Sequence, residues 1–190
     1  MNNQEVEIKI KIDDPKALIA KTESLGGKKL REELQHDVMY DDGKGFFDAE
    51  NCLRLRTIPG HSAYLTLKNK PGNHDYLLTR KELETEVGSA ETMDLILRDL
   101  GFFPHRIKEK QAIYYDLDSV HIRFDKMPFL GDFIEIEAEE SAIEKIVAKL
   151  GLDLKAGIST DYTTLFHNYL KEHRLPLETP QTFDEEKRIL

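Results

Sequence analysis

Charged side chains occupy every second position in several short segments of this 190-residue chain. Residues 5–12 read Glu-Val-Glu-Ile-Lys-Ile-Lys-Ile, so that charged and aliphatic residues alternate. Residues 80–87 and 133–139 repeat the alternation with runs of glutamate. Carboxylates grouped in this way can bind Mg²⁺ or Mn²⁺, hard cations that prefer oxygen ligands. Arginines and lysines grouped in this way can hold a polyphosphate through charge-assisted hydrogen bonds.

Basic side chains follow the same alternation in the first strand segment and in the segments between the acidic ones. They are Lys9, Lys11, Arg54, Arg56, Lys68, Lys108, Lys110 and Arg123. Phosphoryl chemistry uses cations to neutralise phosphate oxygens and a metal ion to activate the electrophile. A site that gathers both sets of side chains would therefore suit a phosphate-bearing substrate.

The spacing of these residues predicts the elements that carry them. Period-two alternation indicates a strand with one charged face and one apolar face. An acidic strand followed by a helix that ends in glycine occurs three times, with helix starts predicted at Asp14-Pro15, at Ser89 and at a Ser141–Glu144 capping box. Further strands are predicted over 52–58, 63–68, 107–115 and 119–126, with a weaker strand over 37–41 and a fourth helix over 160–172.

The charged strand faces could point either to bulk water or into a closed barrel. In an open antiparallel sheet they would face water. Glutamates at three successive same-face positions argue against this, because like charges two residues apart lie only about 6.5–7 Å from each other. In a closed barrel, acidic and basic strands face each other, and their attraction compensates for the repulsion between like charges on each strand. A barrel of eight strands also leaves room for one small ligand. The sequence therefore predicts an α+β fold: a closed eight-stranded antiparallel β-barrel, or tunnel, with a polar interior and helices over its apolar outside.

The charged strands also resemble, in order, the signature of a known family. Glu5-x-Glu7-x-Lys9 is similar to the ExExK strand of the CYTH superfamily, also called triphosphate tunnel metalloenzymes. The later matches are Arg54-x-Arg56, Lys68, Arg80-x-Glu82-x-Glu84, Lys108-x-Lys110, and Asp125 followed by the LGDFxExE-like segment 130–137. The resemblance covers about residues 4–170 and is greatest to the class IV adenylyl cyclase branch.

Two positions depart from the family pattern. Lys110 stands where the family usually has arginine, so bidentate phosphate binding is not expected there. Residues 159–162 keep only the tyrosine of a Lys-Ser-Tyr motif that often accompanies the C-terminal helix of the family.

The resemblance implies dependence on Mg²⁺ or Mn²⁺ and a triphosphate-bearing substrate such as ATP, inorganic triphosphate or thiamine triphosphate. The implied metal ligands are the carboxylates Glu5, Glu7, Asp125, Glu135 and Glu137. The implied substrate-binding side chains are Lys9, Arg54, Arg56, Lys68, Arg80, Lys108, Lys110 and Arg123. The catalytic candidates are Glu82, Glu84, Lys9 and Arg56.

Three functions remain open at this stage. A class IV adenylyl cyclase-like enzyme would convert ATP to cyclic AMP and pyrophosphate, with positioning and electrostatics carrying the reaction. A triphosphatase would bind its substrate with the same groups and use a carboxylate such as Glu82 or Glu84 to orient water. A non-enzymatic protein would use the tunnel as a receptor for polyphosphate or metal.

The amino-acid composition limits the binding partners and the cellular location that can be expected for the protein. The net charge of −9 argues against a general binder of nucleic acid or anionic membranes, which would need a basic surface. A single cysteine, a polar N-terminus and the absence of any long apolar stretch indicate a soluble cytoplasmic protein. We expect one tunnel domain over residues 1–172 and an extended or mobile tail over 173–190, with a homodimer as one option for the oligomeric state.

Overall fold

The structure is a computed structural model that describes residues 4–46, 51–69, 72–74 and 76–190. The strands are β1 (Gln4–Ile12), β2 (Lys28–Asp41), β3 (Cys52–Thr57), β4 (Ala63–Lys68), β5 (Gly72–His74), β6 (Leu77–Val87), β7 (Phe103–Leu117), β8 (Val120–Met127) and β9 (Gly131–Glu137). The helices are α1 (Pro15–Ser24), α2 (Ala90–Asp99), α3 (Glu140–Leu150), α4 (Tyr162–Glu172) and α5 (Phe183–Ile189), with a short 3-10 turn at Leu154–Ala156.

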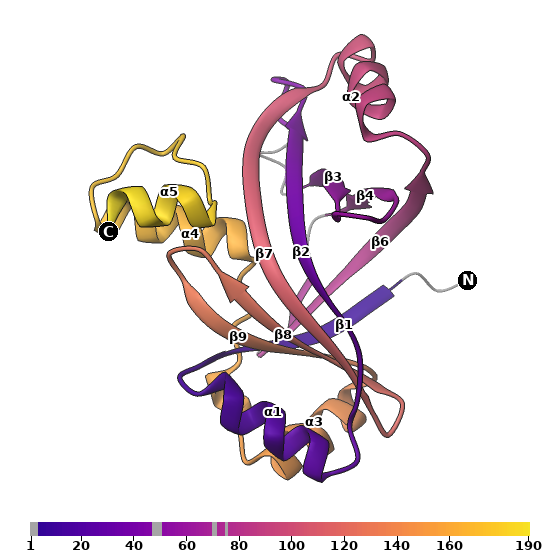
Figure 1. Ribbon diagram of the computed structural model, residues 1–190, viewed down its shortest axis with the longest axis vertical. Helices are drawn as coiled ribbons and strands as arrows, with labels where there is room; N and C mark the ends of the chain where they lie inside the picture. Colours follow the sequence, from indigo (N-terminus) through magenta and orange to yellow (C-terminus); the bar gives the residue numbers. More distant parts are fainter. Residues whose placement is uncertain (1–3, 47–50, 70–71, 75) are drawn as a thin grey trace.

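Eight of the described strands close into a ring in the order β1-β9-β8-β7-β2-β3-β4-β6, because β6 pairs back onto β1. Every neighbouring pair in this ring is antiparallel, and the short β5 adds to one edge of β6. The ring is tunnel-like rather than a regular barrel, with the long strands β2 and β7 curving side by side along one wall (Figure 1). The predicted α+β tunnel is therefore confirmed.

The alternation of charged and aliphatic residues sets the two faces of the ring. In β1, Ile8, Ile10 and Ile12 are buried on the outer face, while Lys9 between them is equally buried on the inner face. Cross-strand partners share a face, so the pairing of Lys9 with Glu135 places β9 glutamates on the same inner surface. A strand that is buried on both faces in this way needs cover on its apolar side.

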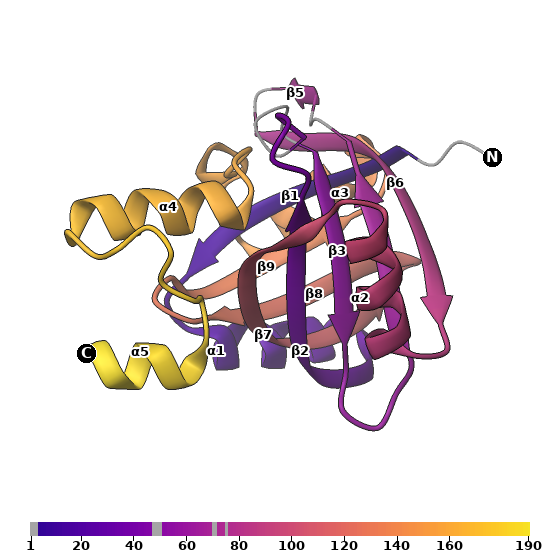
Figure 2. The same cartoon turned by 90° about the horizontal axis from the view of Figure 1, so that it is seen from above.

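Helices supply that cover over three separate apolar clusters. Below the ring in Figure 1, α1 and α3 pack on the outer aliphatic face of β1, β8 and β9. At the opposite end, α2 packs through Leu97 on β3, β4 and β6. On the third side, α4 packs through Phe166 and Leu170 against the segment between β8 and β9, and α5 lies beside α4 (Figures 1 and 2). The hydrophobic core thus lies outside the ring, and the interior is left to charged residues.

The helix starts agree with the sequence at two of three places. The Asp14 carboxylate accepts a hydrogen bond from the Ala17 amide at 2.9 Å, and the Ser89 hydroxyl accepts one from Thr92 at 3.1 Å. The predicted Ser141–Glu144 capping box was wrong. Helix α3 begins at Glu140, so Ser141 lies inside its first turn, and the N-cap residue Glu139 makes no side-chain cap.

Strand β2 is much longer than the predicted segment 37–41. It extends from Lys28 and pairs with β7 along nearly its whole length. The prediction missed residues 28–36 because charged and polar residues occupy both faces of this segment, which weakens the period-two pattern. The added length includes three residues that line the cavity of the ring, Arg31, Glu33 and Gln35.

The C-terminal segment is not the extended or mobile tail that the sequence predicted. It contains α5, and Gln181 forms a parallel bridge with Lys108 on the edge of β7 that β8 leaves uncovered. The Glu109 amide donates to the Gln181 carbonyl at 2.8 Å, and the Gln181 amide donates to the Ile107 carbonyl at 3.0 Å. The proposed boundary between a domain at 1–172 and a tail at 173–190 stays a prediction. No helix in the described part of the chain is long and apolar enough to cross a membrane.

Candidate active site

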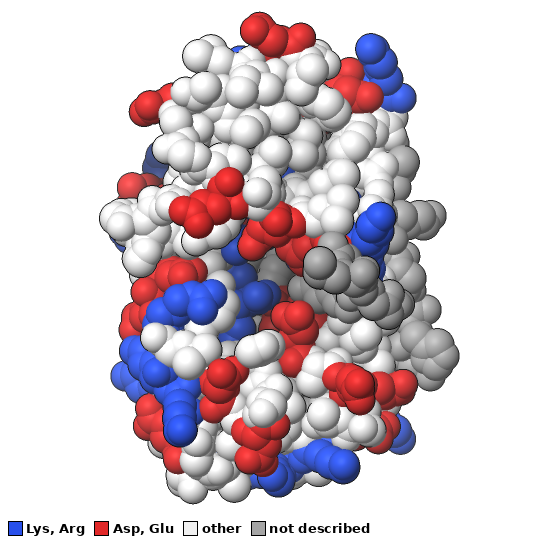
Figure 3. All heavy atoms as spheres, turned by 90° about the vertical axis from the view of Figure 1, so that its right-hand side faces the viewer, with Lys and Arg blue, Asp and Glu red and all other residues white. Residues whose placement is uncertain are grey.

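The ring encloses a cavity of about 830 Å³ whose wall is dominated by charged side chains. Acidic and basic residues meet at a hollow on the face shown in Figure 3. Most of the predicted site residues line this cavity: Glu7, Lys9, Arg54, Arg56, Lys68, Arg80, Glu82, Glu84, Lys108, Lys110, Arg123, Glu135 and Glu137. Glu5 pairs with Arg80 through its backbone, but its side chain lies outside the described residues. Asp125 is described and lies behind the cavity wall.

One wall of the cavity, which we call the cation wall, consists of Arg54, Arg56, Lys108 and Lys110. It comes from β3 and β7, on either side of β2. Behind it lies Asp37 of β2, which is 1% exposed and which the sequence analysis did not identify. Asp37 accepts a bidentate pair from Arg56, with Nε–Oδ1 at 2.7 Å and Nη2–Oδ2 at 2.8 Å.

Asp37 also lies close to two other members of the cation wall. Its Oδ2 atom is 3.8 Å from Arg54 Nη1 and 3.9 Å from Lys108 Nζ. Burial opposes ionisation of Asp37, but Arg56, Arg54 and Lys108 outweigh it and hold the pKa of the carboxyl well below its usual range. One permanently charged acid thus fixes three bases in position.

Asp125 performs the same task for Lys110. Its Oδ2 atom accepts hydrogen bonds from Lys110 Nζ at 3.0 Å and from the Tyr162 hydroxyl at 3.1 Å, and Arg123 Nε lies 3.1 Å from both of its oxygens. Burial opposes its ionisation, yet Arg123 and Lys110 keep its pKa below the usual value. With these donors around it, Asp125 is placed to support the wall rather than to face the cavity.

The lysines of the cation wall have depressed pKa values because they are buried among other cations. Burial lowers the pKa of Lys108 to about 8, although Asp37 partly restores it. Burial and then Arg123 lower the pKa of Lys110 well below its usual value. An arriving polyanion would stabilise the protonated form of both, so binding favours proton uptake here.

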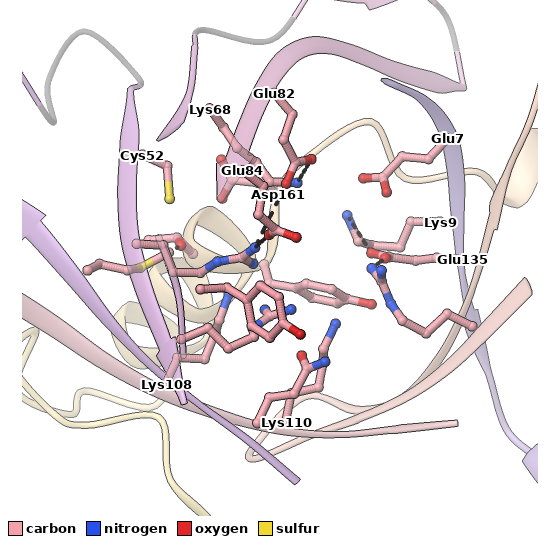
Figure 4. Close-up of a pocket in the computed structure, with 18 of the residues that line it drawn as sticks. Glu7, Lys9, Cys52, Lys68, Glu82, Glu84, Lys108, Lys110, Glu135 and Asp161 are labelled. Carbon is pink, nitrogen blue, oxygen red and sulfur yellow. Dashed lines mark hydrogen bonds and ion pairs between the residues drawn. The ribbon is translucent and has the colours of Figure 1, made fainter. Parts of the chain in front are cut away.

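The opposite wall, which we call the acid wall, consists of Glu7 of β1 with Glu135 and Glu137 of β9. Glu7 and Glu137 are direct cross-strand partners. Like charges in that position repel each other. Glu135 pairs with Lys9 Nζ at 3.4 Å and with Arg123, and Glu7 Oε1 lies 3.8 Å from Arg80 Nη2. Figure 4 shows Glu7, Lys9 and Glu135 together on one side of the cavity.

The donor set of the acid wall fits a hard divalent cation. It offers carboxylate oxygens, without thiol or imidazole ligands, which suits Mg²⁺ or Mn²⁺. Among the described residues, no three acid, histidine or cysteine side chains are yet close enough together to hold a metal. The side chain of Glu5, on the same strand face as Glu7, is outside that description.

Glu82 and Glu84 occupy a third part of the wall, on β6. Glu82 Oε2 lies 2.5 Å from Lys68 Nζ, and Glu84 Oε2 accepts a hydrogen bond from the Thr66 hydroxyl at 2.7 Å. Arg54 Nη2 links the two, at 3.3 Å from Glu84 and 3.9 Å from Glu82. Lys68, Glu82 and Glu84 lie across the cavity from Lys108 and Lys110 in Figure 4.

The start of α4 places Tyr162 in the cavity wall. Besides its hydrogen bond to Asp125, the Tyr162 ring lies 4.4 Å from the Lys9 ammonium, which donates to the Thr160 carbonyl at 3.3 Å. Burial lowers the pKa of Lys9. The tyrosine that the sequence retains from the Lys-Ser-Tyr motif therefore keeps a contact in the site.

The family model that matches this chain describes the CYTH domain and covers residues 3–160. The chain belongs to the CYTH family. A Methanocaldococcus jannaschii protein named "Putative adenylate cyclase" is 30% identical over 162 residues, which is 83% of this chain and 91% of the relative. Members of this family are adenylyl cyclase-like or triphosphatase enzymes that bind triphosphate substrates and use divalent metals, and this chain is an enzyme of that family.

Solved structures show the same fold. The PH1012 protein of Pyrococcus horikoshii matches with a TM-score of 0.73 and 25% identity, over 83% of this chain and 96% of that one. A Vibrio parahaemolyticus protein described as a putative adenylate cyclase also gives a TM-score of 0.73, with 18% identity over 87% of this CYTH chain and 99% of that one.

Among the residues of the CYTH cavity that sequence reasoning missed, four lie on β2. Asp37 supports the cation wall, and Arg31, Glu33 and Gln35 line the cavity beside Tyr114 of β7. All four are odd-numbered residues of β2. Their alternation was the available signal, but polar residues at the even positions Glu32 and His36 concealed it.

Proposed function

We propose that this protein is a divalent-metal-dependent adenylyl cyclase of the class IV type, which converts ATP to cyclic AMP and pyrophosphate. The observation that carries the proposal is a single cavity with a cation wall facing an acid wall. The volume of about 830 Å³ lies within the usual range for small-molecule sites. The relative from Methanocaldococcus jannaschii, named as a cyclase and similar over most of both chains, supports the choice of reaction.

In this proposal the acid wall holds Mg²⁺ or Mn²⁺ through Glu7, Glu135 and Glu137, with Glu5 as the fourth carboxylate that the sequence offers. A metal held there would supply charge to neutralise phosphate oxygens and would make the α-phosphorus more electrophilic. Asp125 was predicted as a ligand too. Since it is enclosed by Lys110, Arg123 and Tyr162, we assign it the role of positioning these side chains.

The phosphates lie on the basic side chains of the cavity. Arg54, Arg56, Lys108 and Lys110 form the largest group, and Lys9, Lys68, Arg80 and Arg123 complete it. Asp37 holds Arg56 in one orientation before substrate arrives, so that little reorganisation is needed on binding. This arrangement favours an extended polyanion over a single phosphate.

Cyclisation forms a bond from the ribose 3′-oxygen to the α-phosphorus and breaks the bond to the bridging oxygen of pyrophosphate. The hydroxyl proton goes to a carboxylate on the cavity wall, for which Glu82 and Glu84 are the candidates. Lys9 and Arg56 stabilise the charge that develops on the phosphate oxygens. Positioning by both walls supplies most of the rate enhancement, so no covalent intermediate is required.

A triphosphatase is the second candidate. The Glu84 side chain is 43% exposed although it hydrogen-bonds Thr66 and Arg54, so it is placed to orient a water molecule. Hydrolysis would then occur at the terminal phosphorus of inorganic triphosphate, thiamine triphosphate or a nucleotide. Cytoplasmic location, a homodimer and the absence of nucleic-acid and membrane partners remain predictions from the sequence.

Product analysis separates the two functions. Purified protein is incubated with Mg²⁺ or Mn²⁺ and ATP, inorganic triphosphate or thiamine triphosphate, and products are separated by chromatography. Cyclic AMP with pyrophosphate supports the cyclase, whereas orthophosphate without cyclic nucleotide rejects it and supports the triphosphatase. The Glu135→Gln variant should lose turnover, while Glu140→Gln, at an exposed position of α3, should retain it. Binding of triphosphate without any product would leave only a receptor.

A further inference from the structure

Several cavity-lining side chains have no part in the proposed phosphate and metal roles, and four of them contact one another. These four are Arg31, Glu33 and Gln35 of β2 and Tyr114 of β7, which we call the β2–β7 cluster. The three β2 residues share the inner face of the strand, and Tyr114 is the cross-strand partner of Arg31. The cluster adjoins the cation wall, because Gln35 is the cross-strand partner of Lys110.

The cluster is fastened together by short contacts. Arg31 Nε donates to Glu33 Oε1 at 2.6 Å, and the guanidinium carbon lies 3.8 Å from the centre of the Tyr114 ring. Gln35 Nε2 donates both to Glu33 Oε2 at 2.8 Å and to the Tyr114 hydroxyl at 2.6 Å. These contacts hold each side chain in a single orientation.

The contact with Glu33 determines the orientation of the Gln35 side-chain amide. Burial opposes ionisation of Glu33, but hydrogen bonds from Gln35 and Arg31 outweigh it and keep its pKa below the usual value. A carboxylate accepts hydrogen bonds only, so the amide must present its NH₂ group to Glu33. The Gln35 oxygen is then an obligatory acceptor. It is buried in the cavity wall, and no described residue donates to it.

A buried acceptor without a donor is costly, and therefore indicates a missing partner. The partner must supply an N–H or O–H group. The second recognition surface is Arg31, whose side chain is 51% exposed although Glu33 and Tyr114 fix its plane. A fixed guanidinium with one face on an aromatic ring and the other accessible is a stacking surface for a flat heterocycle.

We propose that the β2–β7 cluster is the subsite for the base of a nucleoside triphosphate, and that it selects a base with an exocyclic amine. The base stacks on Arg31, and its amine donates to the Gln35 oxygen. This inference rests on the proposed function, because the phosphates must occupy the adjacent cation wall. It assigns the enzyme a nucleotide substrate, since inorganic triphosphate offers the cluster neither a ring nor a donor.

The test compares three ligands on the full-length protein with metal present. ATP carries the amine, inosine triphosphate replaces it with a carbonyl, and inorganic triphosphate lacks the base. We expect the wild-type protein to bind ATP about tenfold more tightly than inosine triphosphate. The Gln35→Leu variant should reduce this ratio to about one, because the acceptor is gone.

The Arg31→Lys variant keeps the positive charge but removes the planar group. It should weaken ATP binding about tenfold, which corresponds to the free energy that stacking of one base contributes to binding. The inhibition constant of inorganic triphosphate should change far less. The matched controls are Gln111→Leu, on an exposed position of β7, and Arg98→Lys, on an exposed position of α2. Thermal unfolding checks that all four variants are folded.

Each other result overturns the inference. If the variants weaken ATP and inorganic triphosphate equally, the cluster is structural or binds phosphate. If wild-type protein binds ATP and inosine triphosphate equally tightly, a water molecule donates the hydrogen bond to the Gln35 oxygen, and the cluster does not recognise the exocyclic amine. A failure of the proposed function looks different, because ATP would then yield no cyclic AMP with either metal, whatever the order of the ligand affinities. Since Arg31 is exposed, its variant tests the inference even if Gln35→Leu fails to fold.

Discussion

The cation wall and the acid wall of the tunnel differ in how their buried charges are neutralised. Asp37 and Asp125 lie behind the bases of the cation wall and neutralise them without entering the cavity. On the acid wall, Glu7 and Glu137 instead face each other in register. The cation wall therefore has its bases fixed in position before any ligand arrives, whereas the two facing carboxylates of the acid wall would gain from an additional cation.

This difference has a physical reason. A phosphate site needs fixed donors, and a permanent acid behind an arginine holds it in the binding orientation at all times. A metal site needs free carboxylate lone pairs, so permanent counter-ions on every oxygen would compete with the metal. Variants of either wall therefore test this contrast between fixed donors and free carboxylates.

Replacing Asp37 by asparagine should have the largest effect. It leaves Arg56 buried without its bidentate partner, and breaking a buried pair costs about 3–5 kcal/mol of unfolding free energy. Urea unfolding measures this loss, with Asp13→Asn in an exposed turn as the control. A loss below about 1 kcal/mol would show that the cation wall does not depend on Asp37.

The double variant Asp37→Ala, Arg56→Met sharpens this prediction. Removing both charges should restore much of the stability, because an apolar replacement avoids the desolvation of two buried ions. Affinity for triphosphate should stay low, since the phosphate contact is gone. Stability without binding would separate the structural role of the pair from its functional one.

The acid wall should respond in the opposite direction. Glu7→Gln with Glu137→Gln removes a cross-strand repulsion, which offsets the lost contact between Glu7 and Arg80, so the metal-free protein should be unchanged or more stable by up to about 1 kcal/mol. The wild-type protein should gain about 2.7 kcal/mol at a metal concentration of 100 times Kd, and the variant should lose this gain. Calorimetric Tm values without and with Mg²⁺ or Mn²⁺ measure the stability of the metal-free protein and its stabilisation by metal. The control is Glu139→Gln, at an exposed position. An equal metal-induced shift in the variant would place the metal elsewhere.

The pH dependence should reveal Lys108 of the cation wall. Burial lowers its pKa to about 8, so the charge that binds phosphate is present below pH 8 and is lost above it. Triphosphate affinity should therefore fall between pH 7.5 and 9.5, by up to about tenfold per pH unit. Titration calorimetry measures the slope, which Lys108→Arg should flatten because arginine stays protonated.

Lys108 should affect stability with the opposite sign. Between pH 8 and its ordinary value of 10.5, the unfolded chain binds more protons at this residue than the folded protein does. The contribution of Lys108 to stability therefore rises with pH over the range in which binding weakens. A parallel fall of both quantities would point to a different group.

The smallest effect concerns the segment that supports the cation wall from outside. Gln181 is buried, bridges to Lys108 through its backbone and donates from Nε2 to the Pro128 carbonyl at 3.2 Å. Gln181→Ala should cost about 1–2 kcal/mol and weaken triphosphate binding only a few-fold, with the metal-induced Tm shift intact. Thr182→Val, which removes the cap of the outer helix α5, is the matched control. A change confined to metal binding would contradict the assignment.

The sequence was sufficient to place the acid wall and the bases of the cation wall on inner strand faces, because charged residues alternate in β1 and β9 and basic residues alternate in β3 and β7. It was insufficient for β2, where Glu32 and His36 make both faces polar and only pairing with β7 defines the inner one. The C-terminal segment was mispredicted for a related reason. Its hydrogen bonds depend on an edge of β7 that no local pattern reveals.

Closure of the ring through β1 also has a consequence for synthesis of the chain. The N-terminal strand is made first, but its partners β6 and β9 end only at Val87 and Glu137. Because the chain is synthesised at roughly 5–20 residues per second, β1 exists for several seconds or longer before either partner strand has been made. Its alternating charges oppose premature pairing and aggregation during this interval. The residues that serve the finished tunnel would thus first protect the nascent chain.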